Sequence, residues 1–327
     1  RELGLAQHDE EVATAADVEG RTAEELAELV RRTRVFARVT PRQKLQIVDA
    51  ARKAGHFVAV TGDGVNDAPA LRAANIGVAM GKSGTDVARE ASELVISDDN
   101  FSSIVAGIEE GRIAYDNIRK VIYLLVSMGA AELLMVLLSV VKGLPVPLLP
   151  VQLLWLNLVT NGIQGVALAF EPGEGDSLRR KPRPPGEAVF NRLMIERTFV
   201  AMLVVGGGGF LMYDIALQLG WDLSSARNLL LLAMVLFENF HVGNCRSETR
   251  SSFALSPLRS PVLFFGTLGA FLLHVTAMYV PFLQDMLDTK PVDLWTWGIA
   301  VGVSVLIVPV IELHKWWWAK RESPGGK

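Results

Sequence analysis

The sequence predicts a parallel α/β domain followed by an all-α bundle of six membrane-spanning helices. Residues 1–110 mix charged and apolar residues in short segments that alternate between strand-like and helix-like patterns. From Val121 onward the chain is dominated by apolar runs of about 20 residues, the length that an α-helix needs to cross a bilayer. Half of the 327 residues are hydrophobic, a composition too apolar for an ordinary soluble domain.

The chain divides into four parts by composition. Arg1 lies in sequence that already has the pattern of a folded domain, so we expect the chain to be the C-terminal portion of a longer polypeptide. Cys245 is the only cysteine, which excludes an internal disulfide framework. We expect no nucleic-acid partner. The four parts are a cytoplasmic α/β region at 1–100, a helical stalk at 101–120, the membrane helices at 121–318 and a cytoplasmic tail at 319–327.

The α/β region has clear helix signals. Thr22 with Glu25 three residues later forms a capping box, which predicts a helix that ends near Arg32. Thr40 and Pro41 mark the start of a second helix that should end at Gly55. Strands and short helices alternate around these two helices, which indicates a parallel sheet. The expected strands are 35–39, 56–60, 76–80 and 93–97, and the expected short helices are 68–74 and 86–91.

The segment VAVTGDGVNDAPAL, residues 58–71, combines a strand end with an acidic turn. Ligands of parallel sheets bind beyond the carboxyl ends of the strands, where Asp63 and Asp67 would lie. Two carboxylates and Asn66 in one tight turn repel each other unless a cation or donors neutralise them, and Mg²⁺ suits such a set. The alternative is that Asp-Gly and Asn-Asp pairs only form the turn. Lys44, on the preceding helix, is either a partner of this turn or a solvated lysine.

Six apolar runs are long enough to span a membrane. Lys and Arg are concentrated in the connections at 171–197 and 245–261 and after residue 313, and are nearly absent from the other connections. Because cytoplasmic loops carry this excess, we expect a multi-pass integral membrane protein whose soluble part and C-terminus are cytoplasmic. Three tryptophans at 316–318 fit an interfacial aromatic belt. The runs are 121–141, 148–170, 199–219, 228–245, 262–283 and 294–313.

Polar residues interrupt these runs and predict a cation site. Glu132 lies in the middle of the first run, where a carboxylate costs about 2.5–3.5 kcal/mol on insertion scales. Asn157, Thr160 and Asn161 fall at i, i+3 and i+4, on one face of the next helix. A short connection places these two helices side by side, so Glu132 can face this cluster. Helix packing through polar side chains is the alternative for Asn157 and its neighbours.

Three further features of the membrane runs have less specific meanings. Gly162 follows the Asn-Thr-Asn cluster and would ease local unwinding, a device that transporters use. Glu238, Asn239 and His241 in the fourth run either add cation ligands or serve packing. The four glycines at 206–209 indicate a close contact between helices.

Three stretches resemble the P-type ATPases. TGDGVNDAPALRAANIGVAMG at 61–81 resembles the hinge signature of that family, whose phosphorylation domain has the haloacid-dehalogenase-like fold. VTPRQKLQIV at 39–48 resembles the segment that carries the family's lysine, and LPVQLLWLNLVTNG at 149–162 is similar to the sixth membrane span of the calcium-pump branch. The resemblance covers nearly the whole chain. It implies a partial haloacid-dehalogenase-like domain at 1–100.

The resemblance implies roles for the acidic turn. Asp63 would hold the catalytic Mg²⁺, Lys44 would contact a phosphorylated aspartate, and Asn66 and Asp67 would support the phosphate site. These roles fit phosphoryl transfer, which depends on positioning and charge neutralisation. The neighbouring residues expected to bind the phosphate and its cofactor are Thr61, Gly62 and Gly64.

The resemblance also implies roles in the membrane. Glu132, Asn157 and Thr160 match cation ligands of the calcium pumps. Asn161 stands where those pumps have aspartate, and Gly129 stands where an asparagine ligand is expected. Losing a carboxylate and an amide weakens the expectation of two bound Ca²⁺ ions, so a single ion or another cation stays open.

The expected function is the C-terminal part of an ATP-driven, calcium-type cation pump that couples aspartyl-phosphate turnover to transport. The DKTGT motif with the nucleophilic aspartate is absent, as are the nucleotide-binding domain and the first four spans, so the stretch alone should be inactive. Its expected partners are the lipid bilayer, the transported cation and the missing N-terminal part of the polypeptide. Alternatives are a pump for H⁺, Na⁺, K⁺ or Mn²⁺, and a non-catalytic membrane subunit. A membrane-anchored phosphatase needs a nucleophilic aspartate, and the strand at 35–39 contains no acid.

The stretch from Phe101 to Val141 contains no proline. As one helix of about 40 residues it would be about 60 Å long and would join the sheet directly to Glu132. We hypothesise that movement of the sheet tilts this helix and so changes the access and affinity of Glu132.

Overall fold

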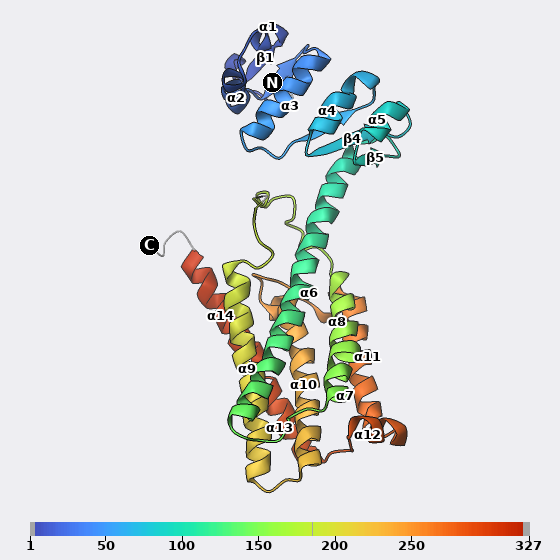
Figure 1. Ribbon diagram of the computed structural model, residues 1–327, viewed down its shortest axis with the longest axis vertical. Coiled ribbons are helices and arrows are strands. Elements are labelled where there is room, and N and C mark those ends of the chain that lie inside the picture. The colour runs from blue at the N-terminus through green and yellow to red at the C-terminus, as the bar shows by residue number, and fades with distance from the viewer. Residues whose placement is uncertain (1–3, 185, 323–327) are drawn as a thin grey trace. The chain divides into compact units, whose positions relative to one another are not determined.

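A computed structural model describes residues 4–184 and 186–322 (Figure 1). The chain forms two compact units, Arg1–Ile108 and Glu109–Lys327. The first unit is α/β and the second is helical throughout its regular elements. Each unit is described below by itself.

Within its described residues the first unit contains five short parallel strands and seven short helical elements with their connecting turns. Its strands are β1 (Val12–Thr14), β2 (Val35–Ala37), β3 (Ala59–Gly62), β4 (Ile76–Met80) and β5 (Leu94–Ile96). Its α-helices are α1 (Ala15–Val18), α2 (Ala23–Arg32), α3 (Pro41–Lys53), α4 (Ala68–Ala73) and α5 (Asp86–Glu90), and its 3₁₀ turns include η2 (Val65–Asp67). The first residues of α6 (Phe101–Val141) complete the unit.

The helix starts follow from capping chemistry. Thr22 accepts a hydrogen bond from the Glu25 amide at 3.3 Å, and the Glu25 carboxylate accepts one from the Thr22 amide at 2.9 Å. The same reciprocal pair joins Thr40 and Gln43 at the start of α3, with Pro41 in the first turn. Both predicted helix starts are therefore confirmed, because each cap satisfies two amides that the helix itself leaves unpaired.

The strands form two separate sheets, which differs from the single sheet expected from the sequence. β1 pairs with β2, with Val12 opposite Val35, whereas β3, β4 and β5 form a second sheet in that order. The strand β1 was not expected, because three residues are too short for a recognisable pattern. The α3 helix contributes to both hydrophobic cores, with Val48 in the core of the larger sheet and Ala50 in that of the smaller one.

The second unit is built from long and broken helices. After α6 come α7 (Pro150–Trp155), the π-helix η3 (Leu156–Thr160) and α8 (Asn161–Ala169), which follow one another without a gap. The remaining helices are α9 (Arg192–Gln218), α10 (Leu223–Cys245), α11 (Pro261–Ala277), α12 (Pro281–Leu287), α13 (Leu294–Ser304) and α14 (Ile307–Glu322).

The six predicted spans are confirmed in part. Within the described residues, four helical stretches are long and apolar enough to cross a membrane: Phe101–Val141, Arg192–Gln218, Leu223–Cys245 and Leu294–Arg321. The pair α11 and α12 gives a fifth if it is counted as one span, although its two helices meet at 92°. The predicted span at 148–170 is divided by the π-helix, so none of its three helices is long enough alone.

The helix α10 lies at the centre of the bundle, between α9 and α11 (Figure 1). Its residues from Leu229 to Val235 are almost fully buried. The helix α9 approaches α6 closely, because a Cβ added at Gly206 would lie 2.6 Å from the carbonyl oxygen of Ala131. The predicted close contact at the four glycines is therefore confirmed at Gly206, where only glycine leaves room for the other backbone.

Candidate functional site

The acidic turn after β3 is fixed by a lysine from α3. Lys44 Nζ lies 2.7 Å from Asp67 Oδ1 and donates a second hydrogen bond, at 3.2 Å, to the carbonyl oxygen of Thr61. Side chains of both charged residues are mostly buried, 33% and 24% exposed. Lys44 is therefore a partner of the turn and not only a solvated lysine. The sequence placed the two residues on neighbouring elements but did not predict this ion pair.

Glycine at position 62 is required by this packing. A Cβ at Gly62 would lie 2.5 Å from the Cβ of Asp67, which is closer than real side chains come. The neighbouring Gly64 differs, since a Cβ there would lie 3.9 Å from the nearest atoms. The Gly64 amide donates a hydrogen bond of 3.4 Å to Asp67 Oδ2. Strand β3 thus ends where Asp67 folds back over its last residue.

Asp63 and Asn66 lie on the exposed side of the turn. The backbone carbonyl of Asp63 accepts a hydrogen bond of 2.8 Å from the Thr85 amide, which ties the turn to the start of α5. Among the described residues the Asp63 carboxylate makes no hydrogen bond or ion pair. An unpaired carboxylate at the end of a strand is a ligand that Mg²⁺ binds together with phosphate oxygens and water.

The charge state of Asp67 follows from its surroundings. Burial raises the pKa of the Asp67 carboxyl. The hydrogen bond and the charge of Lys44, together with backbone amides, have a larger effect in the opposite direction, so the pKa lies below its usual value. Asp67 therefore stays ionised at neutral pH and holds the Lys44 ammonium in place.

The sequence did not identify a second acidic residue that organises the neighbouring loop. Asp99 has a left-handed backbone, φ 56°, and its carboxylate accepts the amides of Lys82 at 2.9 Å and Ser83 at 2.7 Å. These backbone hydrogen bonds, led by that of Lys82, lower the pKa of Asp99 to about 2. The turn-forming sequence Asp-Asp-Asn at 98–100 is the signal that could have identified it.

In the second unit the structure brings Glu132 and Asn157 together. Asn157 Nδ2 donates a hydrogen bond of 3.2 Å to Glu132 Oε2. Glu132 is buried, and its other oxygen, Oε1, has no hydrogen-bond partner in the described part of the chain. The predicted juxtaposition of α6 and the following helical segment is therefore observed.

The three polar residues of that segment differ in exposure. Asn157 is exposed, whereas Thr160 and Asn161 are fully buried. The segment is a π-helix, in which the Asn161 amide bonds to the carbonyl of Leu156, five residues back. Thr160 Oγ1 donates to the Leu156 carbonyl at 2.7 Å.

Two further buried polar side chains lack partners. Neither side-chain atom of Asn161 makes a hydrogen bond within residues 4–184 and 186–322. Glu238 lies beside Thr160, whose hydroxyl donates to Leu156 instead, so neither Glu238 oxygen accepts a hydrogen bond of normal geometry within those residues; both Asn161 and Glu238 are fully buried. Glu238, on α10, lies within electrostatic range of Glu132. Buried polar groups without partners are rare in native structures, so these side chains are available to bind a ligand. The sequence had left open whether Glu238 belongs to this set.

The neighbours of Glu238 serve contacts between helices. Gln164 Nε2 on α8 donates to Asn239 Oδ1 at 2.7 Å. His241 Nε2 lies 2.9 Å from Ser127 Oγ on α6, and its ring packs edge-on against Tyr123 with 5.2 Å between ring centroids. Asn239 and His241 therefore join α10 to its neighbours, which is the packing role that the sequence left open.

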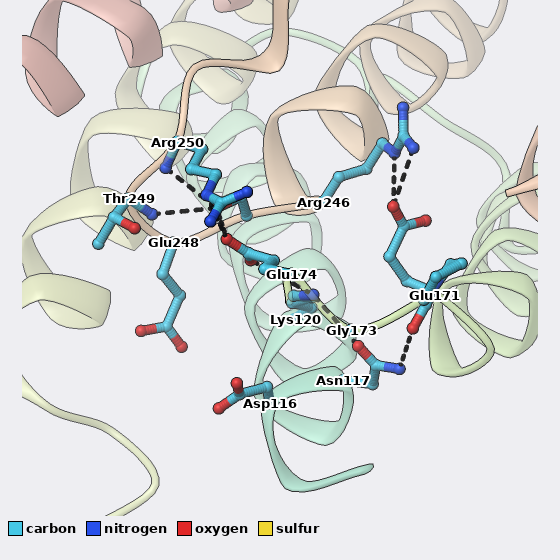
Figure 2. Close-up of polar contacts among 12 residues, drawn as sticks. Asp116, Asn117, Lys120, Glu171, Gly173, Glu174, Arg246, Glu248, Thr249 and Arg250 are labelled. Carbon is cyan, nitrogen blue, oxygen red and sulfur yellow. Dashed lines mark hydrogen bonds and ion pairs between the residues drawn. The ribbon is translucent and has the colours of Figure 1, made fainter. Parts of the chain in front are cut away.

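A network of polar contacts joins α6 to two connections of the same unit (Figure 2). Asn117 Nδ2 donates to the carbonyl of Glu171 at 2.7 Å, and Arg246 forms an ion pair of 2.9 Å with the Glu171 carboxylate. Lys120 Nζ lies 3.8 Å from Glu174, which also pairs with Arg250 at 3.3 Å. These contacts hold the connections that follow α8 and α10 against α6.

The chain thus combines an acidic turn built around a lysine with a bundle of apolar helices that carries buried carboxylates, several of these helices being long enough to cross a membrane. Residues 145–317 match the family model described as "Cation transporting ATPase, C-terminus". The chain belongs to the cation-transporting ATPase family, which confirms the resemblance to P-type ATPases.

Individual relatives agree with this assignment. The chain is 42% identical over 284 residues to the calcium-transporting ATPase of Bacillus subtilis (strain 168), a match that covers 86% of the chain and 32% of the relative. It is 37% identical over 314 residues to the probable cation-transporting ATPase F of Mycobacterium tuberculosis (strain ATCC 25618 / H37Rv), covering 95% and 35%. It is 34% identical over 318 residues to the calcium-transporting ATPase type 2C member 2 of Mus musculus, covering 97% and 34%. The chain thus spans about a third of the length of these relatives.

Proposed function

We propose that this chain is the C-terminal part of a calcium-type pump that couples ATP hydrolysis and aspartyl-phosphate turnover to cation transport. The names of the relatives in bacteria and mouse support both the ATPase activity and the calcium type. The rest of the polypeptide supplies the nucleophilic aspartate, the nucleotide-binding domain and the first four spans. Because the relatives are about three times longer than the matched stretch, this division agrees with their length.

The acidic turn contributes to the phosphoryl-transfer site. Lys44 neutralises phosphate charge, Asp67 holds Lys44, and Asp63 with Asn66 faces the incoming phosphorylated aspartate. The free carboxylate of Asp63 would hold Mg²⁺, and the bound ion would supply charge neutralisation at the transferred phosphoryl group. The backbone of Thr61, Gly62 and Gly64 shapes the turn so that phosphate oxygens can approach it. The exposure of the Asp63 side chain supports this assignment.

The transported cation binds among the polar side chains of the bundle. Glu132 and Asn157, with Thr160 and Asn161, form the site, and Glu238 adds a second carboxylate. The observation that carries this assignment is the set of buried oxygens without partners on Glu132, Asn161 and Glu238. Ca²⁺ prefers six to eight such oxygen ligands, and Asn157 on the exposed side leaves room for ligands from the missing spans. One ion per cycle is the stoichiometry that this ligand set favours.

The membrane topology has six crossings, with the α/β region and the C-terminus in the cytoplasm. The helical segment α7–η3–α8 and the bent pair α11–α12 provide the two crossings that are not single straight helices. Basic residues in the connections after α8 and α10 support the cytoplasmic assignment.

Coupling between the two sites runs through α6. The structure has one α-helix of 41 residues from Phe101 to Val141, and Glu132 lies on it. A straight helix of this length extends about 60 Å. Movement of the α/β unit during phosphorylation tilts α6 and changes the access and affinity of Glu132.

The test is cation-stimulated ATPase activity of the full-length protein. Glu132→Gln should abolish stimulation, because it removes the carboxylate that Asn157 orients. Asn161→Asp should raise the affinity for divalent cations about tenfold, since it adds a buried charge beside the ion. Asn228→Asp is the matched control, because Asn228 lies on α10 about 15 Å along the helix from Glu238 and should leave the affinity unchanged. A silent Glu132→Gln variant would show that the membrane site is wrong.

A further inference from the structure

We infer that a pocket between α9 and α14 binds the headgroup of an anionic phospholipid. The pocket has a volume of about 430 Å³ and is lined by Asn191, Arg192, Leu193, Thr249, Trp318 and Arg321. Its size lies in the range of small-molecule sites, roughly 300–1,000 Å³. None of these residues belongs to the acidic turn or to the proposed cation site.

The position of the pocket matches the boundary between hydrocarbon and water. Arg192 is the first residue of α9, whose apolar run begins at Phe199, and Arg321 lies in the last turn of α14. Trp318 belongs to the run of three tryptophans, a residue type that is enriched at headgroup depth. A ligand in this pocket would therefore touch both the polar connection and the lipid acyl region.

The charge of the pocket is unbalanced. Arg192 Nε pairs with Glu196 Oε1 at 2.8 Å, and Arg321 lies 4.0 Å from the same oxygen. Two guanidinium groups thus share one carboxylate, which leaves one positive charge without a counter-charge among the described side chains at this site. Both arginines are accessible, with side chains 69% and 44% exposed. A phosphate group, which accepts paired hydrogen bonds from guanidinium, supplies the missing charge.

Two tryptophans restrict the motion of the Arg321 side chain, so its guanidinium is positioned to bind a ligand. Its guanidinium lies 5.2 Å from the ring centroid of Trp317 and 5.7 Å from that of Trp318. These contacts hold the charged group against the aromatic surface at the rim of the pocket. The helix α9 adds the amides of Arg192 and Leu193, which have no intrahelical acceptor, whereas the Met194 amide is already capped by Asn191 Oδ1 at 2.9 Å.

A lipid is the source of this phosphate. The connections on this side of the bundle carry the excess of Lys and Arg that marks the cytoplasmic leaflet, where anionic lipids concentrate. Basic pockets between membrane helices on that side bind anionic headgroups. Leu193 and the indole of Trp318 offer apolar surface to the glycerol and the first acyl carbons, which a free phosphate would leave unused.

The test is lipid binding to the full-length protein by native mass spectrometry, with phosphatidylglycerol and phosphatidylcholine as probes. The wild-type protein should bind phosphatidylglycerol more tightly than phosphatidylcholine. Arg192→Gln with Arg321→Gln should weaken that binding about 25-fold, or about fivefold for each arginine. The matched control is Arg179→Gln with Lys320→Gln, which removes the same charge from basic residues outside the pocket and should keep the preference.

A second variant should change the affinity for phosphatidylglycerol in the opposite direction. Glu196→Gln removes the carboxylate shared by the two arginines and should strengthen phosphatidylglycerol binding severalfold. The proposal is overturned if Glu196→Gln has no effect or weakens binding, or if the control pair loses as much affinity as the pocket pair. It is also overturned if inorganic phosphate displaces the lipid at equal concentration, because the pocket is then a site for free anions.

Discussion

The two polar regions of this protein treat their carboxylates in opposite ways. In the turn after β3, Asp67 is paired with Lys44 and with a backbone amide, and Asp99 in the next loop accepts two more amides. In the bundle, Glu132 keeps one oxygen without a partner and Glu238 keeps two, within the described residues. The α/β turn pairs its part-buried Asp67 and leaves only the exposed carboxylate of Asp63 without a partner, whereas the bundle leaves buried oxygens without partners.

The difference follows from the cost of burying charge. A carboxylate in a partly exposed turn loses little hydration, so one lysine is enough to fix it. A carboxylate buried in apolar surroundings without a partner costs several kcal/mol, so a native structure keeps it only when a ligand or proton compensates. The comparison teaches that the α/β turn is formed before its ligand arrives, whereas the bundle site depends on its cation.

The largest expected effect comes from interrupting α6, whose residues belong to both units. A Gly-Pro pair inserted near Ala114 in the full-length protein should interrupt α6, because proline removes a backbone donor and clashes with the preceding turn. ATP hydrolysis should persist while cation transport is lost. The measurement is the number of ions transported per ATP in sealed vesicles.

The control inserts the same two residues after Gly220, in the turn between α9 and α10, where the backbone already has a positive φ of 83°. That variant should keep the wild-type ratio of ions to ATP. Retained coupling in the Ala114 insertion would refute the transmission through α6.

A smaller effect separates two glycines of the acidic turn. Gly62→Ala places a Cβ 2.5 Å from that of Asp67, so Asp67 must move away from Lys44. Overpacking of this kind costs about 1–3 kcal/mol, and we expect dephosphorylation of the phosphoenzyme to slow at least about tenfold. Rapid-quench measurement of phosphoenzyme decay checks this rate.

Gly64→Ala is the matched control for this prediction. Its backbone, φ −112° and ψ 164°, is open to alanine, and the added Cβ would meet only ordinary contacts at 3.9 Å. The decay rate should stay near that of wild type. Equal slowing in both variants would mean that the turn responds to any side chain, and that the Asp67 contact has no special role.

The sequence predicted best where local chemistry decides. Strand β4 spans the predicted residues 76–80, and both capping boxes start helices at the predicted positions, because caps depend on residues three apart. The strand β1 and its separate sheet were missed, because pairing between Val12 and Val35 is a tertiary choice that three residues cannot signal.

The candidate sites show the same limit. The meeting of Glu132 and Asn157 could be predicted because a short connection forces two helices side by side. For the π-helix at 156–160 the sequence offered only Gly162 as a sign of local unwinding; the π-helix also contacts α10 and α11, and such tertiary contacts have no local sequence signal.

The smallest expected effect is a pH-dependent difference between Lys44→Met and wild type in the amide protection of the acidic turn. The pKa of Asp67 is lowered in the folded protein, so the pair with Lys44 stabilises the turn above the unfolded pKa of about 3.9. This stability is lost as the pH falls through the lowered folded pKa. Lys44→Met should therefore weaken protection of the amides at 61–67 by about 1 kcal/mol at neutral pH.

The difference between Lys44→Met and wild type should shrink as the pH falls below about 4 and close below the lowered folded pKa of Asp67, where Asp67 is protonated and no longer attracts Lys44. Hydrogen exchange read by mass spectrometry, corrected for intrinsic rates at each pH, measures it in the full-length protein. Lys53→Met is the control, because Lys53 lies on the same helix, is exposed and has no ion pair among the described residues. A difference that persists at low pH would show that Lys44 acts through packing of its aliphatic stem, and the turn would then depend less on charge than the comparison with the bundle requires.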